Sequence, residues 1–496
     1  MTYVTSLISR RGMLKATGAV GIAAAATTAT TTLSAAPAAA AGGALVHPGL
    51  LHTGTDLARM ATKVKAGAQP YTAGYARLTA NRHAQSGWTA RPQATVVRGG
   101  TGQNYTILYN DIHAAYQNAL RHHVGGDSAH ADTAVAILNA WSAKLTGLAG
   151  NADRFLAAGL YGYQFANAAE LVRDHPEFEL DRFQEMLSTV FAPLSDSFLA
   201  EHNGAVITNY WTNWDLTALA CVLATGIFCD DRAQVARAVD YFKHGAGLGS
   251  IKHAIPVVHD DGLAEWLEAG RDQGHALLGV GLMGTVCEMA WNQGIDLYGY
   301  DDSRFLKGAQ YVAKWCLGGE VPFTANTRAK GAVNGWSGVE TVTQAAGVDP
   351  GMQRPIWAMI SNHYTKRRGL SASYVTRIAA KASPEGGGGD YGPNSGGYDQ
   401  LGFGTLAFTR DKVIGAVGSS PGVVASGGGA GVPSASASGS ASASASGSPA
   451  SGSDLAATGA DSVVGWAAAA GIGAIAGGLL FLRRRDRVRG ASRGGV

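Results

Sequence analysis

A run of serine, alanine and glycine near the C-terminal end limits what this chain can fold into. Residues 419–454 consist mainly of these residue types and include the stretch SASASGSASASASGS. Such a sequence has no large side chains with which to bury a core, so we expect a flexible spacer. The spacer leaves residues 42–418 as the folded part, which is long enough for one large domain or two smaller ones.

The N-terminal residues 1–41 have the composition of a secretion signal. Arg10 and Arg11 precede a weakly apolar stretch rich in alanine and threonine, and no acidic residue occurs in this segment. Paired arginines before such a stretch resemble a twin-arginine signal, and Ala39–Ala41 offers the small residues that a signal peptidase needs. We therefore expect an exported protein whose mature chain begins near Gly42.

The C-terminal residues 455–496 resemble the wall-sorting signals of Gram-positive bacteria. The pentapeptide Leu455–Gly459 precedes an uncharged run at 463–482, and a cluster of arginines follows. About 20 residues in a helix span roughly 30 Å, the thickness of the hydrocarbon layer, and the arginines favour a cytoplasmic end. The pattern predicts a membrane span in the precursor, cleavage by a sortase between Thr458 and Gly459, and attachment to peptidoglycan. A plain membrane anchor is the alternative.

Apolar residues recur every three or four positions through most of the folded part. This period predicts helices, and strand-like alternation is absent before about residue 371. Short turns between the segments, with no repeat of 20 to 50 residues, predict a mainly all-α domain of helical hairpins in an α/α toroid or barrel. A segment rich in glycine at 386–405 is expected to close it irregularly. The predicted helices are 107–124, 130–148, 154–173, 182–199, 214–227, 233–245, 263–292, 303–317 and 353–365.

Charge and cysteine content exclude some classes of function. The formal net charge is +3, but the signal contributes three basic residues and residues 460–496 contribute six arginines against two aspartates, so the mature domain is slightly acidic. No basic stripe indicates a nucleic-acid partner. The spacings of histidine and cysteine match no metal signature, and we predict no cofactor and no metal. The cysteines, free or paired in disulfides, are Cys221, Cys229, Cys287 and Cys316.

One polar segment of the predicted helix 263–292 groups the side chains that proton transfer requires. Its charged residues recur at spacings of three and four, which would place carboxylates, a guanidinium and an imidazole on one helix face. Glycines inside the segment favour close approach of another group over a simply solvated face. The residues on this face are Glu265, Glu268, Arg271, Asp272 and His275.

Aromatic residues interleaved with asparagine form a second cluster. The chain reads EHNG at 201–204 and NYWTNW at 209–214, and WNQGIDLYGY follows at 291–300. Flat rings stack on sugar faces while amides bond hydroxyl and carboxylate groups in fixed directions. The composition indicates a carbohydrate site, whereas an aromatic core at a helix start with asparagine caps is the alternative.

Several strings of the folded part resemble, in order, the bacterial alginate lyase superfamily of α/α-toroid polysaccharide lyases. The resemblance extends from about residue 47 to residue 405. It is carried by ILNAWSAKLTGL, GLYGYQFANAAELVR, NYWTNWDL, EAGRDQGHALLG, AWNQGIDLYGYDDSR and RPIWAMISNHY.

The resemblance implies β-elimination on an anionic polysaccharide that contains uronic acid, alginate-like or glucuronan-like. On this reading His275 removes the proton, Tyr210 or Tyr298 acts as the acid, and Arg271 orients the cluster. The residues expected to bind substrate are Asn209, Asn213, Trp211, Trp214, His202, Asn203, Glu268 and Gln273.

The sequence departs from the best-studied branch of that superfamily in two places. An Asn-His pair just before Tyr-Trp is replaced by Ile207–Asn209, and the tyrosine expected seven residues after Arg271 is Leu278. Two alternatives therefore stay open. One is a glycoside hydrolase that uses two carboxylates, Glu268 with Asp215 or Asp272. The other is a surface glycan-binding protein without activity.

Overall fold

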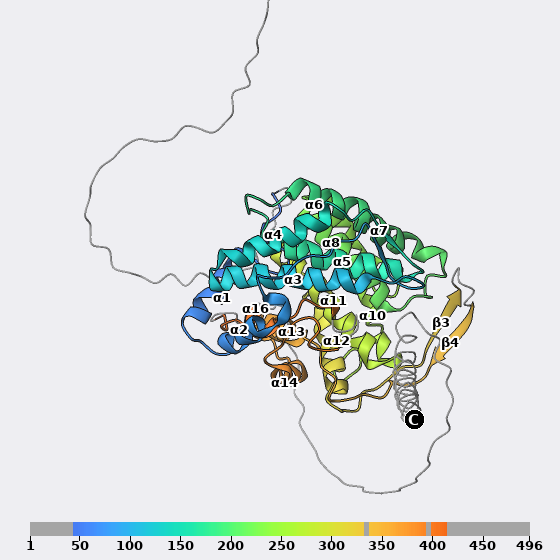
Figure 1. The fold of residues 1–496 in the computed structure, drawn as a ribbon. Helices are drawn as coiled ribbons and strands as arrows, with labels where there is room; N and C mark the ends of the chain where they lie inside the picture. The colour runs from blue at the N-terminus through green and yellow to red at the C-terminus, as the bar shows by residue number, and fades with distance from the viewer. Residues whose placement is uncertain (1–42, 332–336, 393–397, 414–496) are drawn as a thin grey trace, which may run out of the picture.

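Nearly all regular structure in the described residues, 43–331, 337–392 and 398–413 of a computed structural model, is helical (Figure 1). The longer helices are α1 (Gly54–Lys65), α2 (Tyr71–Ala80), α3 (Tyr105–Gly125), α4 (Ser128–Ser142), α5 (Asp153–Glu170), α7 (Ala192–Glu201), α8 (Thr212–Phe228), α9 (Arg232–His244), α11 (Gln273–Asn292), α12 (Tyr300–Cys316) and α14 (Ser373–Ala382). The shorter helices are η1 (Arg82–Ala84), α6 (Leu180–Met186), η2 (Leu187–Phe191), η3 (His202–Gly204), α10 (Ile251–Ala254), η4 (Leu267–Gly270), α13 (Trp357–Asn362), η5 (His363–Arg367) and α16 (Gly404–Ala407).

Two small sheets accompany the helices. Strands β1 (Thr95–Val97) and β2 (Gly147–Ala149) pair in parallel, and β3 (Asn326–Gly331) and β4 (Ser337–Val342) form an antiparallel pair that projects from the helical body in Figure 1.

The inner row of helices is buried around its whole circumference. Every residue of α8 is buried, and α5 and α11 are nearly as enclosed. A helix that is apolar on all sides must lie inside a larger assembly. Accordingly α8 packs between α5 and α11, and α5 packs in turn against α3.

Outer helices cover this row and complete a mainly α-helical α/α toroid, as predicted. Helix α4 packs on α3, α9 on α8, and α12 on α11, each joined to its inner partner by a short turn. Helix α9 buries only one face, with Val235, Ala238 and Phe242 directed inward. The circuit closes because α11 contacts α13, α13 contacts α16, and α16 contacts α1.

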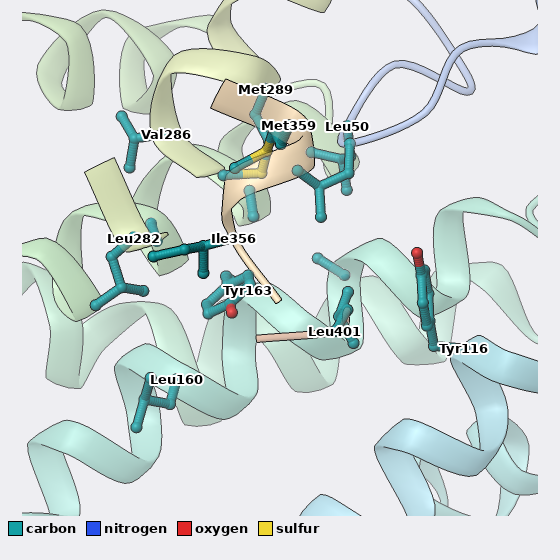
Figure 2. Packing of buried hydrophobic residues seen from close by; sticks show 14 of the residues in the cluster. Leu50, Tyr116, Leu160, Tyr163, Leu282, Val286, Met289, Ile356, Met359 and Leu401 are labelled. Carbon is teal, nitrogen blue, oxygen red and sulfur yellow. The ribbon is translucent and has the colours of Figure 1, made fainter. Parts of the chain in front are cut away.

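Apolar side chains from segments far apart in the sequence meet inside the ring. Figure 2 shows Tyr163 of α5, Leu282 of α11, and Ile356 and Leu401 of the C-terminal segments converging on one region. All four are at most 3% exposed. This packing fixes where each inner helix begins, and therefore where the polar residues at the helix ends lie.

The structure differs from the sequence prediction at two places that matter for the site. The helix predicted at 263–292 begins only at Gln273, and the short 3-10 turn η4 precedes it. The β3–β4 hairpin lies in a region where no strand-like alternation was found, and α14 follows residue 371.

The predicted secretion signal, spacer and wall-sorting segment lie outside the described residues. The expected membrane span at 463–482 belongs to this part of the chain. Among the residues that the structure does describe, no helix has the length and apolarity needed to cross a membrane.

Candidate active site

Asp272 ends the turn before α11 and holds His275. Its backbone is extended (φ −170°, ψ 162°), and its Oδ1 accepts a hydrogen bond from the backbone N–H of His275 at 2.8 Å, which makes it the N-cap of the helix. Its Oδ2 lies 2.6 Å from Nδ1 of the same imidazole. Burial raises the pKa of Asp272, but the hydrogen bonds from His275 outweigh burial and lower this pKa to about 2. An ionised carboxylate only accepts, so Nδ1 carries the imidazole proton.

Arg271 meets the other nitrogen of the same ring. Its Nη2 lies 3.1 Å from Nε2 of His275, and because a guanidinium can only donate, Nε2 accepts with its lone pair. The imidazole is therefore neutral, with an unprotonated Nε2 directed at a cation, and its side chain is 29% exposed. A neutral imidazole with one nitrogen fixed by a carboxylate is the form that a general base requires.

Glu268 lies behind Arg271. Its Oε1 accepts from Arg271 Nη1 at 3.2 Å, and its side chain is fully buried. Burial raises the pKa of Glu268 to about 8, although Arg271 opposes this shift. Glu268 thus holds the guanidinium from the interior and does not face a substrate.

Asn213, at the start of α8, connects the aromatic cluster to Arg271. Its Oδ1 accepts from Arg271 Nη1 at 3.2 Å. The ring of Trp211 lies 5.6 Å from the Arg271 guanidinium, within the range of a cation–π contact. The two predicted clusters, one near residue 210 and one near residue 270, therefore form a single site.

A second guanidinium, which the sequence analysis missed, lies on the same tryptophan. Arg328 of β3 is 4.1 Å from the Trp211 ring, donates to the carbonyl oxygens of Thr208 and Asn209, and forms an ion pair with Glu340 of β4 at 2.6 Å. Nothing in the local sequence indicates this role, because only the hairpin brings Arg328 across more than 100 residues to the site.

Asn209 and Tyr210 occupy the segment that the hairpin holds. Oδ1 of Asn209 accepts from the backbone N–H of Gly331 at 3.0 Å, while its buried Nδ2 has no hydrogen-bond partner among the described residues. The hydroxyl of Tyr210 accepts from Nδ2 of Asn203 at 3.0 Å. Its ring packs 4.6 Å from that of Trp214, which is buried and serves the aromatic core.

The structure places Tyr298 away from Arg271 and His275. It is fully buried, and its hydroxyl lies 3.2 Å from both the Gly284 carbonyl oxygen and Glu288 Oε2. Glu288 follows His275 by 13 residues in the same helix, a separation of about 20 Å along its axis. Tyr210 is therefore the tyrosine that remains as a candidate acid.

Three other predicted residues make internal contacts. His202 is buried and lies 2.7 Å from Asp215, and Gln273 bonds the backbone of Asp349. Glu265 does not share a helix face with Arg271. It accepts instead from the backbone N–H of Thr324 at 2.7 Å.

The carboxylates considered for a hydrolase are not arranged about a common space. Asp215 is fully buried, with Oδ1 bonded by His202 and Oδ2 bonded by the Gly249 N–H at 2.8 Å. Glu268 is buried beneath Arg271, and Asp272 binds His275. Asp215 and Glu268 are thus enclosed in the interior, whereas the side chain of Asp272 is 44% exposed and is engaged by His275.

The thiols and metal-binding residue types add no further centre to the described part of the chain. Cys221, Cys229, Cys287 and Cys316 are free thiols. Over the described ranges, no three side chains of histidine, cysteine, aspartate or glutamate gather into a potential metal site.

Comparison with known proteins finds a match to one family model over the centre of the chain. Residues 99–323 match the family model described as alginate lyase. The matched segment extends from just before α3 to just after α12, so it contains Arg154, Tyr210, Arg271 and His275, whereas Arg328 lies beyond it. No curated protein sequence matches the chain.

Several solved structures are also similar. The alginate lyase A1-III from Sphingomonas species A1 is 14% identical over 74% of this chain and 98% of its own, with a TM-score of 0.48. An alginate lyase from Bacteroides ovatus is 15% identical over 55% of this chain and 84% of its own, with a TM-score of 0.40. A variant of A1-III complexed with a tetrasaccharide is 15% identical over 51% of this chain and 74% of its own, with a TM-score of 0.37.

Proposed function

From the premise that the chain is a polysaccharide lyase with an alginate lyase domain over residues 99–323, we propose that it cleaves a uronate-containing polysaccharide by β-elimination at the Arg271–His275 cluster. The substrate class is an alginate-like or glucuronan-like polymer. The observation that carries the proposal is the neutral imidazole of His275, held at Nδ1 by Asp272 and presenting Nε2 to Arg271.

The residue types match what the reaction requires. The C5 proton of a uronate is weakly acidic, so the neighbouring carboxylate must be neutralised before the proton can leave. Arg271 and Asn213 supply this neutralisation. When Arg271 turns to the substrate carboxylate, Nε2 of His275 is released to take the C5 proton. The electron pair then forms the C4=C5 bond, the C4–O4 bond breaks, and O4 takes a proton from the hydroxyl of Tyr210.

The positive charge near Trp211 supports an anionic polymer. Arg271 and Arg328 both lie over its ring, within 6 Å of the centroid. Glu340 and Asp272 each pair with one of these guanidinium groups, and the two groups together still offer several donors to an anion beside the indole. A flat indole beside them offers a surface for a sugar ring.

The first test is a panel of uronate polymers followed by the ultraviolet absorbance of the C4=C5 bond. The wild-type protein is expected to generate this absorbance on at least one polymer, and the polymer that responds identifies the uronate. Reducing ends without the absorbance would indicate a hydrolase, and binding without either product would indicate a glycan-binding protein. Each of these two results would overturn the proposal.

The second test is His275→Ala. Loss of a positioned proton transfer lowers the rate by about 10²–10⁴-fold, so kcat should fall by this factor while the polymer still binds. His244→Ala is the matched control, because His244 lies on the outer helix α9 and pairs only with Asp240 in the same helix. Retention of wild-type kcat by His275→Ala would remove this residue from the mechanism.

Export and wall attachment form a separate proposal, supported by the sequence of the two ends. Arg10 and Arg11 before an apolar stretch favour export, and the LAATG pentapeptide favours sortase transfer to peptidoglycan. Expression of the full chain in a Gram-positive actinomycete, followed by wall digestion, should release the protein. A Thr458→Ala variant should stay with the membrane fraction. Equal recovery of both proteins from the membrane would support the plain anchor instead.

A further inference from the structure

Three side chains from separate parts of the chain form a line of hydrogen bonds that ends on Tyr210. Arg154, in the first turn of α5, donates from Nη2 to Oδ1 of Asn203 at 3.3 Å. Asn203, in the turn after α7, donates from Nδ2 to the Tyr210 hydroxyl oxygen at 3.0 Å. Tyr210 precedes α8 and is next to Trp211, which contacts Arg271.

The order of donors and acceptors along this line has one solution. A guanidinium has no acceptor, so the atom of Asn203 that faces Arg154 must be its carbonyl oxygen. The amide NH₂ of Asn203 then faces Tyr210 and must donate to the phenol oxygen. The hydrogen of the Tyr210 hydroxyl is therefore not used by Asn203 and is left for another acceptor.

The backbone at His202 and Asn203 is held in the left-handed conformation, which non-glycine residues seldom adopt and which asparagine and histidine adopt more often than most. His202 and Asn203 have φ values of 47° and 54°, two consecutive non-glycine residues in the left-handed region. Such conformations persist where the surrounding structure holds them, and they gather at functional sites. Here Asp215 bonds the His202 imidazole at 2.7 Å, and Tyr241 and the Gly249 N–H hold Asp215 in turn.

We propose that Arg154 and Asn203 are positioning residues that set Tyr210 as the proton donor to the leaving O4 oxygen. This inference rests on the proposed β-elimination and assigns its acid step. It also replaces the earlier expectation that Asn203 binds substrate. In the step the Tyr210 O–H bond breaks and an O4–H bond forms as C4–O4 cleaves, and the phenolate left behind is stabilised by the Asn203 amide. The proton taken by His275 leaves to solvent, and solvent returns one to Tyr210.

The test uses a leaving group that needs no proton. A short uronate oligosaccharide with fluorine in place of the O4 substituent loses fluoride during the same elimination, so it requires the base but not the acid. Asn203→Gly removes the amide, and glycine adopts the left-handed backbone freely. On the polymer, its kcat should fall by about 10²-fold with little change in KM, the size of one lost proton transfer. Fluoride release should stay within about twofold of wild type.

A second pair of variants tests the order of donors and acceptors from Arg154 to Tyr210 without changing the turn that contains Asn203. Arg154→Lys keeps a residue that only donates, so it should retain most polymer cleavage, whereas Arg154→Met leaves the Asn203 amide free to flip and should lose more. Asn139→Ala on α4 is a control for loss of an amide elsewhere, because the side chain of Asn139 bonds peptide groups of the 177–179 segment.

The outcomes separate this inference from the function on which it rests. Absence of double-bond formation and of fluoride release in the wild-type protein would overturn the elimination itself. Equal losses on polymer and fluoride substrate in Asn203→Gly and Arg154→Met would leave elimination in place and overturn the positioning role. Loss of activity on the polymer alone in Asn203→Gly and Arg154→Met, with His275→Ala inactive on both substrates, would support the positioning role.

Discussion

At the scale of single residues, Arg271 is the centre of the site because its donors reach three different groups. Nη1 bonds Asn213 and Glu268, and Nη2 bonds His275. These contacts set the position of the cation in the resting protein, and in the proposed reaction its Nη2 exchanges the imidazole for the substrate carboxylate while Nη1 stays bonded. The buried carboxyl group of Glu268 decides how much of this charge is neutralised in the resting protein.

The raised pKa of Glu268 predicts a pH dependence of stability. In the unfolded chain its pKa is near 4.5, and burial raises it to about 8 in the folded protein. Between these values the folded state binds more protons than the unfolded state, so the contribution of Glu268 to stability is full below pH 4.5 and falls as pH rises toward 8. Glu268→Gln, which is always neutral, should show a weaker loss of stability over this range in urea unfolding at pH 5 and pH 8.

The difference in pH dependence between wild type and Glu268→Gln reports on Glu268 alone and not on other buried acids. Glu385 is also buried with a pKa raised to about 7, and it contributes equally to the wild-type protein and the variant. Identical pH slopes for wild type and Glu268→Gln would show that Glu268 is ionised in the folded protein at neutral pH.

At the scale of elements, two short features outside the long helices arrange the site. The extended residue Asp272 follows η4 and caps α11, and this cap places His275 in the first turn of the helix, next to Arg271. The β3–β4 hairpin clamps the backbone before Tyr210 and Trp211 through Arg328, and Val206 and Thr208 add hydrogen bonds to its strand.

Substitution of Arg328 should affect catalysis more than stability. Arg328→Ala removes the hydrogen bonds to two carbonyl oxygens and the contact with Trp211, so the Asn209–Trp211 segment should lose its alignment with Arg271. Misplacement of reacting groups by about 1 Å can cost about 10²-fold, and kcat/KM on the responsive polymer should fall by about 10- to 100-fold.

Lys330→Ala is the control on the same strand, because Lys330 also approaches Glu340, at 3.5 Å, but its side chain forms no hydrogen bond or ion pair with the segment of Trp211 within the described residues. An unchanged kcat/KM for Arg328→Ala would show that the hairpin does not hold the site.

At the scale of the whole molecule, the ring depends on contacts between the two ends of the folded part. Arg410 bonds Asp56 at the start of α1 and lies 3.4 Å from Glu288 of α11. Burial raises the pKa of Asp56, but Arg410 and Arg59 outweigh burial and hold this pKa well below its ordinary value. Arg59 also donates to the carbonyl oxygen of Ala407 in α16, so α1 and the last described segment are joined at several points.

Arg410→Ala should lower the free energy of unfolding by about 2 kcal/mol. Hydrogen bonds to charged groups contribute about 1.5–3 kcal/mol each, and the loss is moderated because Asp56 keeps Arg59 and Glu288 keeps Arg367. Urea denaturation at neutral pH measures the change. Lys63→Ala removes an exposed ion pair with Asp411 nearby and should leave stability unchanged. Equal effects of the two substitutions would contradict a specific closing role for Arg410.

The sequence predicted the long helices better than their ends. The period of apolar residues places the helices at 107–124 and 214–227 within two residues of α3 and α8. The same pattern extended α11 backward to residue 263, because a polar segment with helical spacing does not reveal that Asp272 leaves the helical conformation. Glu268 and His275 both contact Arg271, although Glu268 and Arg271 precede α11 and do not share a helix face with His275.

The sequence alone determined the helical class, the resemblance to lyases and the types of residue at the site, since these follow from local periodicity and short motifs. It also singled out Arg271, His275 and Tyr210. Only the tertiary structure decided which candidates meet. The length of α11 separates Tyr298, which bonds Glu288, from His275, and the hairpin brings Arg328 onto Trp211. Contacts of this kind join residues far apart in the chain, and their geometry depends on the packing of the whole ring, which no local pattern encodes.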